Sequence, residues 1–186
     1  MAPDGPIMTL EEFLTLPEEK PALEYADGVI EQKVAPQTFH GRMQYKFAEW
    51  VNLYAEPRQL AMAFTETRST FGGRSYVPDV GIYSWARLPR QSSGKLLAAF
   101  RTPWSVAVEV VSPEQSRRNL EDKCRWYVTH GVALALLIDP DREDVVRFGD
   151  DGTRIVLRDR DRIDLDTVIP GFALTVADLV ATLYPG

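Results

Sequence analysis

Two short and almost entirely apolar segments constrain the fold most strongly. They are residues 104–111 (WSVAVEVV) and residues 133–139 (ALALLID), and a proline closes each one. Runs this apolar are typical of strands that are buried on both faces of a sheet. Residues 119–130 lie between them and place apolar side chains at helical spacing, with Gly131 as a stop. The three segments predict a βαβ unit at the centre of the fold.

The other segments predict a mixed sheet with helices on its faces, which is an α/β (α+β) fold class. A capping-box pattern at Thr9 and Glu12 opens a short helix that Pro17 closes. The remaining predicted elements are two strands joined at Asp27-Gly28, a helix over 38–54, a hairpin of 60–71 and 75–84 around Gly72-Gly73, an edge hairpin within 145–157 and a closing helix over 176–183.

The length of 186 residues fits one domain, so we expect a leader over 1–8 and a single domain over 9–186. One cysteine excludes an internal disulfide, and Cys124 falls in a helical apolar stripe, where core packing explains it. No apolar run reaches the ~18 residues of a membrane span, and the N-terminus lacks a secretory pattern. We therefore expect a cytoplasmic protein that does not enter a membrane.

Net charge is −6, which counts against a broad surface for binding nucleic acid. It leaves room for a small site in which a divalent cation supplies the positive charge. The two histidines, His40 and His130, accompany no Cys/His cluster, so a zinc site of the usual spacing is excluded.

The unusual feature is acid inside apolar strands. Glu109 has valine on both sides, and a buried carboxylate requires a partner because it loses its hydration. Asp79 follows Pro78, which should interrupt the strand there. Glu24 lies on the first strand, and the adjacent turn does not explain it. Three carboxylates on neighbouring strands suit Mg²⁺ or Mn²⁺, although a structural salt bridge to a buried Arg or Lys would also account for Glu109.

These motifs resemble the PD-(D/E)XK nuclease superfamily and, more specifically, the Uma2 family (DUF820) of predicted endonucleases. The resemblance implies a restriction-endonuclease-like mixed central sheet flanked by helices, with an added edge hairpin. It implies Mg²⁺- or Mn²⁺-dependent cleavage of phosphodiester bonds in DNA by a possible homodimer. The matching features are Leu23-Glu24-Tyr25 with Asp27-Gly28, Pro78-Asp79-Val80, Val108-Glu109-Val110-Val111-Ser112-Pro113, Lys123 with Tyr127, and Pro170-Gly171-Phe172.

The chain departs from the superfamily motif at Val111, because the motif places a lysine two residues after the glutamate. The resemblance implies that Lys123, on the following helix, supplies that lysine, which either orients the attacking water or stabilises negative charge on the phosphate. The implied catalytic set is Glu24, Asp79, Glu109 and Lys123, in which the three acids are the metal ligands. A solvated helix lysine is the other interpretation of Lys123.

Weaker candidates surround this set. His40, Arg42 and Arg117 are candidate substrate contacts, and Glu66 is a possible additional ligand. Gln44 and Tyr127 can face the site from the two helices. Two other functions stay open: a catalytically silent binding or assembly module on the nuclease fold, and an unrelated α/β domain with buried salt bridges.

Overall fold

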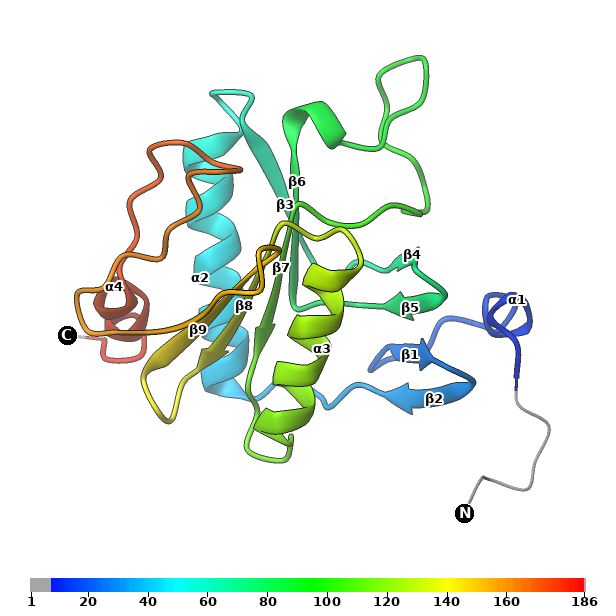
Figure 1. Cartoon of the computed structure of the whole chain (residues 1–186), viewed down its shortest axis with the longest axis horizontal. Helices are drawn as coiled ribbons and strands as arrows, with labels where there is room; N and C mark the ends of the chain where they lie inside the picture. The colour runs from blue at the N-terminus through cyan, green and yellow to red at the C-terminus, as the bar shows by residue number, and fades with distance from the viewer. Residues whose placement is uncertain (1–7, 186) are drawn as a thin grey trace.

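The two apolar segments form neighbouring strands at the centre of a six-stranded sheet in the computed structural model, which describes residues 8–185 (Figure 1). The order is β10-β9-β8-β7-β6-β3, and only β7 and β8 run parallel among these pairs. The strands are β3 (Ala61–Thr65), β6 (Val80–Ser84), β7 (Val106–Val110), β8 (Leu134–Asp139), β9 (Asp144–Gly149) and β10 (Arg154–Arg158).

A smaller four-stranded antiparallel sheet lies beside the first, in the order β2-β1-β5-β4. Asp27 and Gly28 form the tight turn between β1 and β2 with φ of 52° and 88°, as the sequence predicts. The strands are β1 (Leu23–Ala26), β2 (Val29–Gln32), β4 (Ser69–Phe71) and β5 (Arg74–Tyr76).

Helices cover both faces of the large sheet. Met43 and Phe47 of α2 pack on the face of β7 that carries Val106, Val108 and Val110. Leu120, Cys124 and Tyr127 of α3 pack on the opposite face, with Ala107. Since strand side chains alternate between faces, Glu109 points to the α3 side. The helices are α1 (Leu10–Phe13), α2 (Thr38–Ala55), α3 (Arg117–Thr129) and α4 (Val176–Ala181), with a 3-10 turn η1 (Trp85–Arg87).

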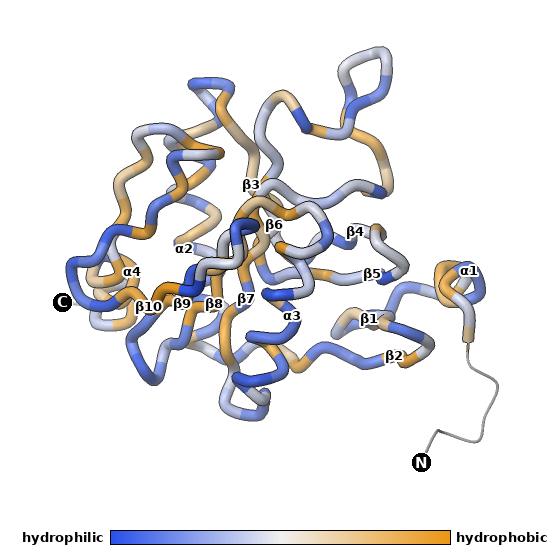
Figure 2. The backbone as a smooth tube through the Cα atoms, viewed as in Figure 1, coloured by the Kyte–Doolittle hydropathy of each residue, from blue (hydrophilic) through white to orange (hydrophobic). Residues whose placement is uncertain are grey.

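The predicted fold class and the βαβ unit are confirmed, and so is the buried, packing role of Cys124. Figure 2 shows hydrophobic residues concentrated in the strands of the large sheet and hydrophilic residues along much of α3. No helix within residues 8–185 has the length and apolar composition needed to cross a membrane. The leader predicted over 1–8 lies outside the described residues, apart from Met8.

The predicted hairpin of 60–71 and 75–84 is wrong in one respect, because its two arms divide between the two sheets. β3 pairs with β6 in the large sheet, whereas β4 pairs with β5 in the small one. Glu66, at φ 47°, and Pro78 interrupt the two arms at the point of division. The division places Asp79 directly before β6, at the junction of the two sheets.

Gly81 of β6 explains how closely Trp104 packs on the sheet. A Cβ atom at Gly81 would lie 2.5–2.7 Å from ring atoms of Trp104, which is fully buried. We therefore expect Gly81→Ala to lower the free energy of unfolding by about 1–3 kcal/mol, the usual cost of overpacking.

Chemical denaturation measures this effect, and Gly41→Ala is the matched control. Gly41 lies inside α2 with no atom within 4 Å of its added Cβ. There the same substitution should raise the free energy of unfolding by about 0.5–1 kcal/mol through helix propensity. An unchanged denaturation midpoint for Gly81→Ala would contradict the packing argument.

Candidate active site

Asp79 lies directly before β6, and Glu109 lies on the adjacent strand β7. β6 pairs with β7 so that Val80 is opposite Val108, and Asp79 precedes Val80. The Asp79 Oδ2 atom accepts a hydrogen bond of 2.7 Å from the backbone N–H of Val110, the residue after Glu109. Both acids are buried, with 2% of each residue exposed. Strand pairing thus brings the two predicted ligands together.

Lys123 of α3 bridges Glu109 and Glu24. Its Nζ atom lies 2.9 Å from Glu109 Oε1 and 2.8 Å from Glu24 Oε2. The Tyr127 hydroxyl donates to Glu109 Oε1 at 2.8 Å, and Glu24 Oε1 accepts from the N–H of Val77 at 2.6 Å. The helix therefore delivers a lysine to the acids, in contrast to a solvated helix lysine, and Tyr127 contacts the site as well as the core.

Lys33 makes the corresponding contact on the other side of the site. Its Nζ atom lies 2.7 Å from Asp79 Oδ1 and 3.0 Å from Glu66 Oε2, and it donates to the Val77 carbonyl at 2.8 Å. Sequence reasoning missed Lys33. It follows the polar residues Glu31 and Gln32, so its local pattern carries no signal of a buried charge.

His40 and Gln44 of α2 complete this side. His40 Nε2 lies 3.2 Å from Asp79 Oδ1, and His40 Nδ1 lies 2.9 Å from Ser112 Oγ. The Gln44 amide donates to Glu66 Oε1 and to the Asp79 carbonyl, each at 2.9 Å. The buried side chain of His40 thus contacts Asp79, a predicted metal ligand.

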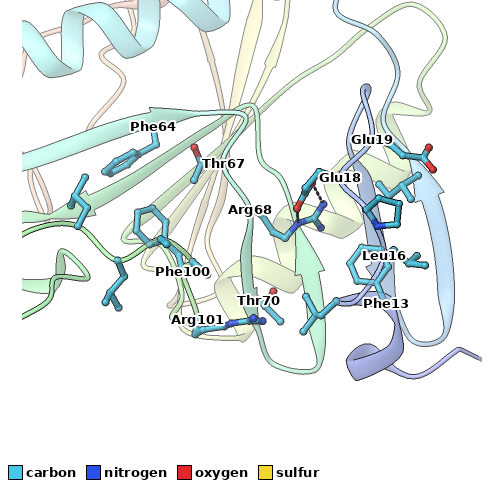
Figure 3. Close-up of a pocket in the computed structure, with 17 residues that line it drawn as sticks. Phe13, Leu16, Glu18, Glu19, Phe64, Thr67, Arg68, Thr70, Phe100 and Arg101 are labelled. Atoms are coloured by element: carbon cyan, nitrogen blue, oxygen red, sulfur yellow. Dashed lines mark hydrogen bonds and ion pairs between the residues drawn. The ribbon is translucent and has the colours of Figure 1, made fainter.

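Part of this charged cluster opens into a cleft of about 450 Å³ between the β1–β2 hairpin and the first half of α3. Glu24, Lys33, Glu109 and Lys123 line it, and Arg74 also contributes. A second cavity of about 460 Å³ lies beside Phe13, Phe64 and Phe100 (Figure 3). That cavity contains the Arg68–Glu18 ion pair and none of the four predicted catalytic residues, so size alone does not locate the site.

The electrostatics of the two acids differ. Burial raises the pKa of Glu109 to about 7, against the opposing charge of Lys123. Burial also acts to raise the pKa of Asp79, but Lys33 and His40 outweigh it and hold that pKa well below its ordinary value. For Lys123, burial opposes the charged form, yet Glu109 and Glu24 raise its pKa. Asp79 is therefore the more firmly ionised of the two acids.

The donor set fits a hard divalent cation. Among the described residues, four carboxylates, those of Glu24, Glu66, Asp79 and Glu109, contact two ammonium groups and the His40 imidazole. When all these carboxylates are ionised and His40 is neutral, an excess of two negative charges is left. Mg²⁺ and Mn²⁺ take carboxylate oxygens as ligands, and either ion would balance this excess. The sequence predicts Asp79 and Glu109, with Glu24, as its ligands.

A second ligand set shares Asp79. Within the part of the chain that the structure describes, ligand atoms of His40, Glu66 and Asp79 lie within 4.8 Å of one another. In the predicted set, Glu24 and Glu109 instead pair with Lys123, whereas Asp79 pairs with Lys33. Asp79 belongs to both sets and is the centre of either arrangement.

Two of the candidate substrate contacts lie apart from the acids. Arg42 donates from Nε to the Thr182 carbonyl beside α4 at 3.2 Å. Arg117 pairs with the buried acids Asp139 and Asp144. Both arginines are occupied by protein partners, so neither is placed against the cleft.

Comparisons with known proteins match most of the chain. Residues 10–177 match the model of the Uma2 family, described as "Putative restriction endonuclease". The crystal structure of "a putative nuclease belonging to DUF820" from Anabaena variabilis is 33% identical, with a TM-score of 0.91 over 95% of this chain and 99% of that one. No curated protein matches the chain. With a family model that spans most of its length and a relative that shares its whole fold, the chain belongs to the Uma2 family.

Proposed function

We propose that the chain is a Mg²⁺- or Mn²⁺-dependent endonuclease that hydrolyses phosphodiester bonds of DNA. The observation that carries the proposal is the buried pair of Asp79 and Glu109, which lies with two lysines in a site that has an excess of negative charge. Buried charge of this kind is costly to the fold, so a role in chemistry is the stronger explanation for it. The nuclease descriptions of the family and of the relative support the same reaction class.

Each residue of the site has its own role in the proposed reaction. Asp79 and Glu109 hold the metal ion, and Glu24 assists while it positions Lys123. The ion supplies a water of lowered pKa and neutralises charge on the phosphate. Lys123 orients the attacking water through its N–H donors. Tyr127 fixes the Glu109 carboxylate by donating to Oε1.

Removal of the metal provides the direct test. We expect the protein to nick supercoiled plasmid with Mg²⁺ or Mn²⁺, and we expect excess EDTA to abolish nicking until the ion is restored. Gel electrophoresis of plasmid forms measures the rate. Cleavage that persists undiminished in EDTA would refute the metal dependence.

A catalytically silent binding or assembly module is the second candidate. Val111 at the motif lysine position and the net charge of −6 favour it. Calorimetric titration with Mn²⁺ separates the two: saturable binding supports the enzyme, and no binding by the folded protein supports the module. A cytoplasmic location and a homodimeric state remain predictions.

A further inference from the structure

Lys33 occupies an unusual position for a residue just beyond an edge strand. It follows β2, and its backbone N–H donates to the Ala22 carbonyl at 2.9 Å. Its side chain crosses to the large sheet, where it is 7% exposed beside Asp79. A buried lysine is rare unless paired, and this one lines the cleft next to a predicted metal ligand. Contact with solvent therefore does not explain why a lysine occupies this position.

Two acceptors outside the predicted ligand set hold the ammonium group in place. One is the Val77 carbonyl at 2.8 Å, and the other is the Glu66 carboxylate at 3.0 and 3.1 Å. Gln44 in turn holds Glu66, because its amide donates to Glu66 Oε1 and to the backbone of residue 79. Lys33 therefore keeps its position even when Asp79 takes another partner.

A lysine ammonium has three N–H donors. In Lys33 these serve Glu66, the Val77 carbonyl and Asp79. A divalent cation on Asp79 would repel the nearby ammonium and take up that carboxylate oxygen. The donor released in this way stays within the cleft, where the available anion is the phosphate of the substrate.

Lys123 lies on the Glu109 side of the same cleft, flanked by the Tyr76 ring at 4.8 Å and the Tyr127 ring at 5.9 Å. The two lysines thus stand on either side of the acid pair, one against each acid. Val111 leaves the motif position without a positive charge, and Lys33 brings one to Asp79 from a different sheet.

We propose that Lys33 is a second catalytic lysine that donates to a non-bridging oxygen of the scissile phosphate. Lys33 and Lys123 then contact the phosphate from opposite sides. The inference rests on the proposed function, because it names a group that contacts the substrate of that reaction. Glu66 and Gln44 are positioning residues for Lys33. The contact stabilises negative charge that develops on the phosphate as the bond breaks.

Lys33→Met tests the inference, with Lys95→Met in the exposed 90–100 loop as the matched control. We expect single-turnover cleavage by Lys33→Met to fall about 100-fold, the usual loss when one charged contact to the transition state is removed. The calorimetric Kd for Mn²⁺ should stay within about threefold of native or become tighter, because a competing cation has gone. Lys95→Met should match the native chain in both measurements.

Cleavage by Lys33→Met within about threefold of native overturns the inference, as does loss of Mn²⁺ binding by the folded variant. Circular dichroism establishes folding. Should Lys33→Met not fold, Lys33→Gln, which keeps N–H donors for the neighbouring acceptors but removes the charge, takes its place, and the same two criteria apply to it.

Two further measurements separate this inference from its alternatives. Glu66→Gln should retain the native Mn²⁺ stoichiometry, and loss of one bound Mn²⁺ would overturn the inference by showing that Glu66 is a metal ligand. If the native chain cleaves nothing, the proposed function fails, and Lys33 is judged on the Kd for a DNA oligonucleotide in Ca²⁺. A Kd raised about tenfold in Lys33→Met supports the phosphate contact, and an unchanged Kd overturns it.

Discussion

Glu109→Gln should abolish metal-dependent cleavage while the fold survives. The amide keeps the size of the side chain but removes an anionic ligand, and carboxylates are the ligands that Mg²⁺ and Mn²⁺ require. We expect the cleavage rate to fall by about 10³-fold, the scale on which loss of one major electrostatic contact slows an enzyme. The calorimetric affinity for Mn²⁺ should fall with it.

The fold should tolerate this change for a specific reason. Burial raises the pKa of Glu109 to about 7, so near neutrality the protonated acid, which an amide resembles, is a substantial part of the population. Tyr127 can still donate to the amide oxygen, and Lys123 keeps both contacts to Glu24. We expect the free energy of unfolding to change by less than about 1 kcal/mol at pH 7.

Glu31→Gln is the control, because Glu31 lines the same cleft but is exposed on β2. It should leave both cleavage and Mn²⁺ affinity close to native. Equal cleavage by the native chain and Glu109→Gln would remove Glu109 from the catalytic set. Unfolding of Glu109→Gln would instead show that the carboxylate serves mainly as the structural partner of Lys123.

The central part of the fold was predictable because its signals are local. Residues 104–139 carry their own apolar periods, and those periods predict β7, α3 and β8 directly. Pro78 predicts an interruption in one arm of the hairpin, but no local pattern shows that β3 to β6 divide between two sheets. This division depends on β5 pairing with β1, where Ser75 lies opposite Tyr25, and contacts that distant in sequence leave no local pattern.

The same distinction separates the parts of the site. Asp79 and Glu109 were identifiable because a charge inside an apolar strand violates a local rule. Lys33 lies in polar surroundings along the chain, and it enters the site only when the two sheets meet, where it contacts Glu66 and Asp79. Lys123 was expected only through the family resemblance, since helix spacing alone does not distinguish it from a surface lysine.

Arg117→Met should destabilise the protein strongly and leave the cleavage rate of the folded protein unchanged. The Arg117 guanidinium pairs with Asp139 and Asp144, whose side chains are 5% and 1% exposed. Removal of the cation leaves two buried carboxylates short of a partner, and breaking buried pairs costs about 3–5 kcal/mol. Because Arg142 and Arg158 keep longer contacts of 3.7 and 3.3 Å to these acids, we expect about 3 kcal/mol, at the low end.

For a domain of this size, that loss corresponds to a fall in Tm of roughly 6–12 °C, which thermal unfolding followed by circular dichroism measures. Arg118→Met is the control, because Arg118 is the exposed neighbour of Arg117. This substitution should change the free energy of unfolding by less than about 0.5 kcal/mol. At a temperature where Arg117→Met is folded, its cleavage rate should equal that of the native chain. If Arg117 contacts the phosphate backbone instead, its variant would keep native stability and show a weaker, less salt-dependent affinity for DNA.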